Sequence, residues 1–249
     1  MSAATHQART VVTTSWDDGH VLDERLAAVL RRYQLPGTFY IAPRNLEFPV
    51  ADRLDDHGIS ELAQQFEIGG HTLTHRRLPQ LDLPTARAEI EDGKAHLERI
   101  TRKPVHSFCY PRGEYRPEHV RLVAQAGFRF ARTVRRLALR PGHRPLETPT
   151  TIHAYQHLRD VPIAGRVARW RPRRVIRLWR NWDDLAVDMF DTALADGGVF
   201  HLWGHSWEID RDQGWQRLER VCEYISRRAG VRYVDNGALH DGGPSAHAR

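Results

Sequence analysis

Cysteine is scarce in this sequence: only Cys109 and Cys222 occur among 249 residues. Neither belongs to a C-x-x-C pair, so the sequence predicts neither a disulfide framework nor a cysteine-rich zinc site. No apolar run approaches the length of a membrane-spanning helix. The N-terminal segment also lacks the basic, then apolar, then small-residue pattern of a signal peptide. We therefore expect a soluble protein with no transmembrane segment, and we predict a cytoplasmic location.

No class of residue is extreme enough to indicate disorder or a fibrous protein. Hydrophobic residues make up 41% and charged residues 27% of the chain, and the net charge is +6. A basic surface favours anionic partners, such as nucleic acid, acidic glycans or an anionic membrane, without identifying one. A chain of this length can bury one sizeable core. We expect one domain over residues 10–239, after an N-terminal extension (1–9) and before a disordered tail (240–249).

Short strand-like runs alternate with helical patterns. The expected strands lie at 8–16, 35–41, 67–72, 105–111, 128–133, 197–205 and 231–234, and the expected helices at 22–33, 59–66 (with Ser60 as N-cap), 84–100, 117–127 and 215–228. Residues 137–165 are too irregular to assign. Repeated alternation predicts an α/β protein in which a parallel sheet has its helices outside. At this length we favour a single barrel-like domain of seven or eight strands over an open sheet.

Two adjacent acids, Asp17 and Asp18, follow the first expected strand in "TTSWDDGH", and Gly19 supplies the turn. In parallel α/β folds, reactive groups gather at the carboxyl ends of the strands. The alternative is a helix N-cap followed by a first-turn acid, because a helical pattern comes next.

A pair of histidines, His71 and His75, follows another expected strand in "HTLTH". If this segment forms one helical turn, the two Cβ atoms lie roughly 5–6 Å apart on one face. An H-x-x-x-H pair alone is weak evidence in a chain with 15 histidines. Two histidines and a carboxylate nevertheless form a common divalent-metal set. With the double aspartate at a neighbouring strand end, one acid could bind the cation while the other acts as general base toward water.

A third segment, "GGVFHLWGHSWE", carries His201, Trp203 and His205 on one side of an expected strand. His205 ends the strand, so we predict that it lies at the catalytic rim as a general acid, with Trp203 and Trp207 stacking on a ligand. His201 lies roughly 13 Å deeper along the strand. We expect it to be a buried, hydrogen-bonded core residue.

Together these segments resemble the polysaccharide deacetylase family (carbohydrate esterase family 4, the NodB-homology domain). Residues 15–19, "SWDDG", are similar to its T-F-D-D-G motif, and residues 71–75 to its H-[ST]-x-x-H motif. Residues 108–115, "FCYPRGEY", are similar to its third motif. The resemblance covers roughly residues 10–235.

The resemblance implies a distorted (β/α) barrel of seven or eight strands and a bound divalent metal. Zinc is the expected ion, with Co²⁺, Ni²⁺, Fe²⁺ or Mn²⁺ as alternatives, and its implied ligands are Asp18, His71 and His75. Asp17 would be the catalytic base and His205 the catalytic acid.

The third and fourth motifs depart from the family pattern. The arginine that orients the family's catalytic aspartate is replaced by Cys109, and Arg112 or another arginine could take its role. The resemblance implies an oxyanion donor in the backbone near Arg112, and we group Arg112 and Tyr110 as oxyanion- or substrate-binding residues. For the fourth motif, an acid near a tryptophan, the sequence offers only "NWDD" at 181–184.

The predicted function is hydrolysis of an N-acetyl group on an amino sugar of a poly-, oligo- or lipid-linked saccharide. One alternative is hydrolysis of another non-peptide amide on the same scaffold. The other is a non-catalytic glycan- or nucleic-acid-binding protein that uses the arginine-rich segment 166–180.

That segment holds seven arginines and two tryptophans. Basic residues interleaved with aromatics can bind nucleic acid or an anionic sugar. The apolar residues from 175 to 189 nevertheless fall on one helical stripe, namely Val175, Leu178, Trp179, Trp182, Leu185 and Met189. We therefore interpret the arginines as the solvated face of an amphipathic helix and expect no nucleic-acid partner.

Overall fold

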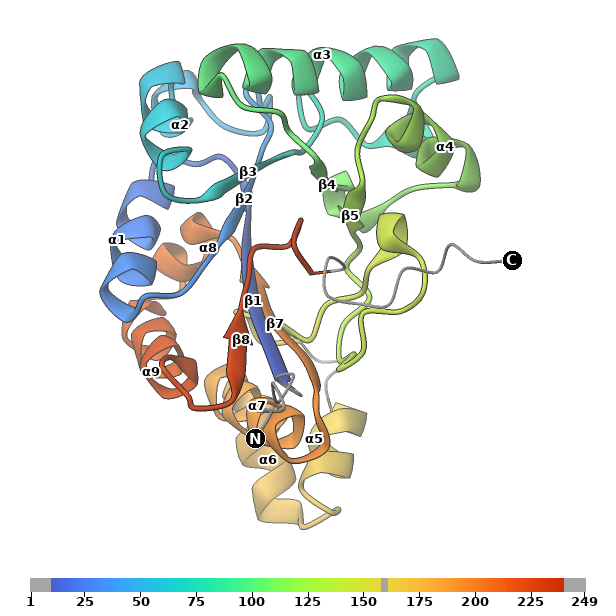
Figure 1. Ribbon diagram of the computed structural model, residues 1–249. Helices are drawn as coiled ribbons and strands as arrows, with labels where there is room; N and C mark the ends of the chain where they lie inside the picture. The colour runs from blue at the N-terminus through green and yellow to red at the C-terminus, as the bar shows by residue number, and fades with distance from the viewer. Residues whose placement is uncertain (1–9, 158–160, 240–249) are drawn as a thin grey trace, which may run out of the picture.

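The computed structural model describes residues 10–157 and 161–239. These residues form one parallel sheet of eight strands, which curves into a half-barrel with helices around it (Figure 1). The path of neighbouring strands is β5-β4-β3-β2-β1-β7-β6, and β8 also pairs with β1. The strands are β1 (Thr10–Asp18), β2 (Thr38–Ile41), β3 (Glu67–Gly70), β4 (Ser107–Cys109), β5 (Phe130–Arg132), β6 (Ile152–His153), β7 (Gly198–Gly204) and β8 (Val231–Tyr233). The parallel α/β barrel that the sequence predicted is confirmed.

Strand β1 is the centre of the sheet. It pairs with β7 along one edge, and with β8 and then β2 along the other. In this register Asp18 lies opposite Ile41, the last residue of β2, and Ile41 lies opposite Gly70, the last residue of β3. The carboxyl ends of neighbouring strands therefore meet at one rim, and the residues that follow them are brought together there.

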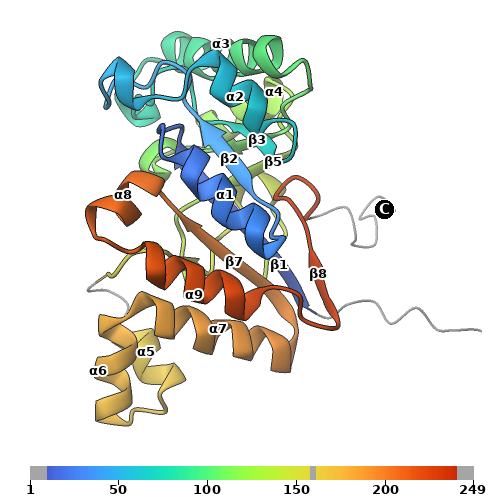
Figure 2. The same ribbon diagram turned by 90° about the vertical axis from the view of Figure 1, so that its left-hand side faces the viewer.

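The helices cover the outside of the sheet. Their bounds are α1 (Asp23–Tyr33), α2 (Asp56–Leu62), α3 (Leu83–Thr101), α4 (Pro117–Gln125), α5 (Val161–Val167), α6 (Pro172–Arg180), α7 (Trp182–Asp196), α8 (Ser206–Arg211) and α9 (Trp215–Ile225). Helices α1, α9 and α7 lie side by side over one face (Figure 2). Their apolar residues, such as Leu26 of α1 and Leu218 of α9, are fully buried. Burial of each such side chain stabilises the fold by about 1.5–3 kcal/mol.

The ends of two helices test the sequence-based predictions. Helix α4 begins at Pro117 as predicted, and Gly127, with φ +86°, follows its last turn. Ser60 is not an N-cap: α2 begins at Asp56, and the side chain of Asp55 accepts a hydrogen bond from the backbone N–H of Gly58 at 2.7 Å. An aspartate already in an extended conformation caps the helix one turn earlier than the apolar pattern indicated.

Residues 175–189 are divided between two helices, α6 and α7, so the continuous helical stripe expected there is wrong. The chain is extended at Asn181 (φ −126°, ψ 98°), between α6 and α7. Leu178 and Trp182 on either side of this break are both buried. Arg173 and Arg177 are exposed, as expected for a solvated face.

The unassigned region 137–165 contains β6, which has only two residues and was too short to predict. The predicted extension (1–9) and tail (240–249) lie outside the described residues. Within the described ranges, none of the helices combines the length and the apolarity that crossing a membrane requires.

A buried polar network fills part of the barrel interior. The guanidinium of Arg132, which is 1% exposed, donates to Asn236 Oδ1 at 2.7 Å. Thr13 Oγ1 donates to the same oxygen at 2.8 Å, and the Asn236 amide donates to the Tyr40 hydroxyl at 3.0 Å. These partners compensate for the loss of hydration at a buried charge.

Candidate active site

Three electron-pair donors converge at the rim. Asp18 Oδ1 lies 3.2 Å from His75 Nε2 and 3.5 Å from His71 Nε2, and the two Nε2 atoms are 3.1 Å apart. Tetrahedral ligands at 2.0–2.2 Å from a zinc ion are roughly 3.3–3.6 Å from one another. Asp18, His71 and His75 are all buried. Their spacing and donor types therefore fit one divalent cation.

Both histidines have an oxygen atom near Nδ1, which leaves Nε2 available to bind a cation. His71 Nδ1 donates to the carbonyl oxygen of Cys109 at 2.7 Å, and His75 Nδ1 lies 3.1 Å from Glu47 Oε1. The acceptor at His71 Nδ1 fixes the hydrogen there and turns the Nε2 lone pair inward, as is usual for metal-binding histidines. The Glu47 carboxylate near His75 Nδ1 favours the same tautomer of His75. Asp18 Oδ1 is buried and has no hydrogen-bond partner among the described residues. Without a cation, the lone pairs of Asp18 Oδ1, His71 Nε2 and His75 Nε2 would face one another.

The backbone around "HTLTH" differs from the helical turn that we considered. The segment is not helical, and Thr72 and His75 both have φ of +65°. Helix α3 contacts this segment: the carboxylate of Glu89 accepts a hydrogen bond from the Thr74 backbone N–H at 2.9 Å. Gly93 permits this approach, because a Cβ there would come within 2.7 Å of the Thr72 carbonyl carbon. The glycine inside the expected helix therefore positions the histidine segment.

Asp17 and Asp18 are strand residues, since α1 begins only at Asp23. The N-cap alternative is therefore wrong. Asp18 has φ +89° and Gly19 φ +74°, and a Cβ on Gly19 would lie 2.7 Å from Ile41 Cγ2. Asp18 also accepts a hydrogen bond from Trp207 Nε1 at 2.9 Å through Oδ2. This sharp turn directs the Asp18 carboxylate toward the histidines.

The two neighbouring acids have opposite pKa shifts. Burial opposes ionisation of Asp18, but His205, His71 and His75 outweigh it and hold its pKa well below the usual range. Burial raises the pKa of Asp17, and the attraction of His71 and His205 only partly offsets this effect. Asp18 is thus the better cation ligand, and Asp17 the better proton acceptor.

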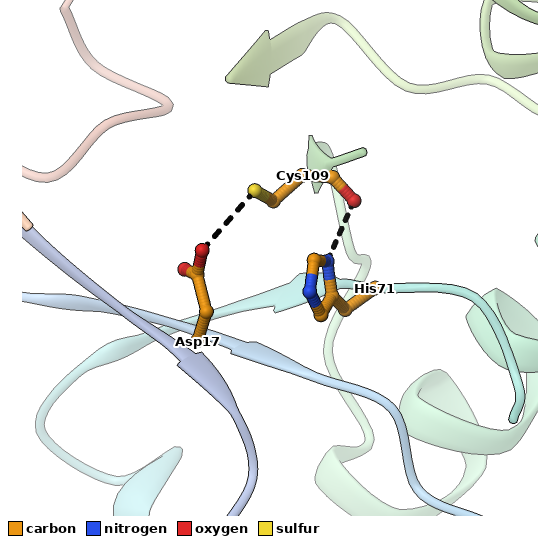
Figure 3. Close-up of side chains that lie close together, drawn as sticks. All are labelled: Asp17, His71 and Cys109. Carbon is orange, nitrogen blue, oxygen red and sulfur yellow. Dashed lines mark hydrogen bonds between the residues drawn. The ribbon is translucent and has the colours of Figure 1, made fainter. Parts of the chain in front are cut away.

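Cys109 contacts the carboxylate of Asp17. Its thiol donates to Asp17 Oδ2 at 3.4 Å, while its carbonyl accepts from His71 (Figure 3). Arg112 does not replace the missing arginine here: it is exposed and its guanidinium pairs with Glu47 at 2.8 Å. Arg132, a different arginine, attracts the Asp17 charge from within the barrel. Asp17 is thus held by a neutral thiol, with a guanidinium charge nearby.

His201 lies within β7 and His205 directly follows it, and the two occupy different surroundings. His205 Nε2 lies 3.8 Å from Asp18 Oδ2, and its Nδ1 lies 2.5 Å from Glu208 Oε2. Burial lowers the pKa of His205, but Asp18 and Glu208 outweigh burial and raise it to about 9. His201 is 1% exposed, and its Nε2 lies 3.0 Å from Ser15 Oγ in the core.

The site opens into a cavity of about 390 Å³, which Asp17, Asp18, His71, His75 and His205 all line. Tyr110, Arg112, Trp203 and Trp207 line it as well. Trp203 stacks on His153 with ring centroids 3.9 Å apart, and the Tyr110 hydroxyl donates to the Leu146 carbonyl at 3.0 Å. The cavity therefore brings together every residue that the sequence analysis assigned to the site.

Sequence reasoning missed four ionisable residues that line this cavity: Glu47, His153, His157 and Glu208. A signal for three of them was present. "HAYQH" repeats the spacing of "HTLTH" within the unassigned region, and Glu208 follows His205 by three residues. Glu47 carries no such signal, because only the fold brings its loop beside His75.

The family model for polysaccharide deacetylases matches residues 4–131, which include both acids, both histidines and Cys109. The chain belongs to the polysaccharide deacetylase family. No similar sequence was found among curated proteins.

Solved structures of deacetylases share the fold. A Mycobacterium smegmatis structure assigned to the polysaccharide deacetylases is 17% identical, with TM-score 0.69 over 94% of this chain and 90% of that one. The Bc1960 peptidoglycan N-acetylglucosamine deacetylase is 16% identical, with TM-score 0.55 over 90% and 85%. Wild-type BA3943 of Bacillus anthracis, a CE4 family pseudoenzyme, is 13% identical, with TM-score 0.51 over 90% and 63%. This chain thus spans less than two thirds of some chains that it matches.

Proposed function

We propose that this protein is a metal-dependent hydrolase that removes N-acetyl groups from an amino sugar. One observation carries the proposal: Asp18, His71 and His75 converge on one point, and a second buried carboxylate, Asp17, adjoins Asp18 on the same strand end. A site for ligand binding alone has no need of a proton acceptor at that position. The family supports the same reaction class.

A cation held by Asp18, His71 and His75 would polarise the acetamide carbonyl and increase the acidity of water. Asp17 accepts the proton of the attacking water, and its raised pKa matches this role better than that of an ordinary carboxyl. Cys109 fixes the orientation of Asp17 through Oδ2. The other carboxylate oxygen, Oδ1, has no hydrogen bond within the described ranges and is left to take the proton.

His205 donates the proton that the leaving amine requires. Its pKa of about 9 keeps the imidazole protonated at neutral pH, and Glu208 holds the Nδ1 side so that Nε2 is directed toward the acids. The backbone N–H beside Arg112 stabilises the oxyanion in this scheme. Acid and base thus come from different strand ends, β7 and β1.

An amino sugar is the substrate class that we favour. The cavity has room for a small ligand, and Tyr110, Trp203 and Trp207 give it an aromatic lining. The similar fold of a peptidoglycan N-acetylglucosamine deacetylase agrees with this choice.

Acetate release from a panel of N-acetylated saccharides tests the proposal. We expect turnover by protein loaded with one equivalent of Zn²⁺, loss of turnover with chelator, and no turnover by the loaded Asp17→Asn variant. Release from simple amides but not from saccharides would favour the other amide hydrolase. Saccharide binding without turnover by any loaded form would favour a non-catalytic protein, as the shared fold of BA3943 illustrates.

A further inference from the structure

A second group of metal-binding side chains lies beside the first. Glu208 Oε2 is 3.1 Å from His153 Nε2 and 2.5 Å from His205 Nδ1. These three atoms all lie within 4.8 Å of one another. Two imidazole nitrogens and a carboxylate are the same donor set as that of Asp18, His71 and His75, and they suit the same borderline cations.

The surroundings of His153 repeat those of His71. His153 is 5% exposed and stacks on Trp203, so its ring is fixed in one orientation. Its other nitrogen, Nδ1, lies 2.7 Å from His157 Nε2, which can accept a hydrogen there and leave the Nε2 lone pair free for a ligand bond. Metal-binding histidines usually have such an outer partner. His153 Nε2 has no hydrogen-bond partner among the described residues, although it faces Glu208.

His205 lies between the two groups. Its Nε2 faces Asp18 at 3.8 Å, and its Nδ1 faces Glu208. The cavity of about 390 Å³ is lined by His153, His205 and Glu208 as well as by the first group, so a cation can reach both from the same side.

We propose that His153, His205 and Glu208 bind a second divalent cation, more weakly than the first group does. The cation takes the free lone pair of His153 Nε2 and binds His205 Nδ1, whose hydrogen, otherwise shared with Glu208, is released to water. His153 then carries its hydrogen on Nδ1, facing His157.

Occupancy of this second site would inhibit turnover, an effect that rests on the proposed function. With a cation on Nδ1, His205 could donate only from a neutral imidazole, which is a much weaker acid than imidazolium. Excess metal would therefore lower the rate that the first equivalent had established.

Equilibrium dialysis of the chelator-treated protein against Zn²⁺ tests the site directly. We expect two bound equivalents in the wild type. Glu208→Gln and His153→Gln should retain the tighter equivalent and weaken the second at least about tenfold. Retention of the first equivalent shows that these variants are folded. His96→Gln, which removes a histidine paired with Asp56 outside the cavity, should still bind two.

A wild type that binds one equivalent even in excess Zn²⁺ would overturn the proposal, since Glu208 would then serve only as the hydrogen-bond acceptor of His205. Two equivalents in both Glu208→Gln and His153→Gln would also overturn it. If acetate release is found, the ratio of the rates with excess and with one equivalent should fall in the wild type and stay near one in His153→Gln. An equal fall in both would refute the inhibitory role. Dialysis still tests the site if no saccharide is turned over, so failure of the proposed function is recognised separately.

Discussion

Cys109 contacts Asp17 with its side chain and His71 with its backbone. The thiol donates to Asp17 Oδ2 at 3.4 Å, and the carbonyl accepts from His71 Nδ1 at 2.7 Å (Figure 3). A thiol is a weak, uncharged donor. It therefore restrains the Asp17 carboxylate without the charge that an arginine would add, and burial leaves the pKa of Asp17 above its ordinary value.

Cys109→Ala should lower kcat about fivefold and leave KM unchanged. The substitution removes one hydrogen bond worth about 1 kcal/mol, and about 1.4 kcal/mol corresponds to a tenfold change in rate. The His71 contact persists because it uses the backbone. Steady-state acetate release measures both constants. Cys109→Ser retains a donor and should recover most of the rate; equal losses in the two variants would mean that packing, not the hydrogen bond, matters.

Asp17→Asn should abolish turnover while the tighter metal equivalent remains bound. The amide cannot accept a proton from water, but Asp18, His71 and His75 are untouched. Metal analysis and acetate release on the same preparation check both halves of the expectation. Activity near that of the wild type would remove Asp17 from the role of base.

His75→Ala should eliminate the tighter equivalent, because it removes one of three converging donors. One equivalent of Zn²⁺ should raise the melting temperature of the chelator-treated wild type, since a ligand that binds only the folded state stabilises it. Calorimetry should show a much smaller rise for the variant, in which only the weaker second site remains. A normal rise would show that the cation binds elsewhere.

The sequence identified residues that line the cavity better than it predicted the backbone around them. Asp17, Asp18, His71 and His205 lie at or next to strand ends, and His75 lies in the loop after β3. Parallel strands bring such ends to one rim. The left-handed conformations of Thr72 and His75 could not be predicted, because they depend on contact with α3 some 15 residues or more along the chain.

Dependence on the local pattern and on distant contacts also explains why β6, Glu47 and the break at Asn181 were not predicted. Strand β6 has two residues, so its β pattern is too short to detect, and His153 at its end went unassigned. Glu47 reaches His75 only through the fold. The helix breaks at Asn181, but the spacing of the apolar residues is the same before and after it. Hydrophobic periodicity alone therefore does not reveal the break.

Asp235→Asn should stabilise the protein above pH 6. Burial, followed by repulsion from Glu67, raises the pKa of Asp235 from 3.8 to about 6. A raised carboxyl pKa gives stability that is complete below the unfolded pKa of 3.8 and is lost as pH rises through about 6. The variant avoids that loss, so we expect a gain of about 1 kcal/mol at pH 8, reduced by the partial exposure of the side chain.

Urea unfolding at pH 4 and pH 8 measures this difference. Asp92→Asn, at an exposed carboxyl of α3, is the matched control and should leave the wild-type pH dependence unchanged. A wild-type pH dependence in Asp235→Asn would assign the effect to another group.

Replacement of His205 and of His201 should have different consequences. His205→Ala should lower kcat roughly 10²–10⁴-fold, as expected when a general acid is removed, and should have little effect on folding because the side chain lies at the cavity. His201→Ala should instead lower the free energy of unfolding by about 2–4 kcal/mol, because it leaves a cavity in the core and removes the partner of Ser15 Oγ. Acetate release and urea unfolding on both variants check the two expectations. If His201→Ala abolished turnover in a stably folded protein while His205→Ala kept its rate, the general acid would have to be sought deeper along β7.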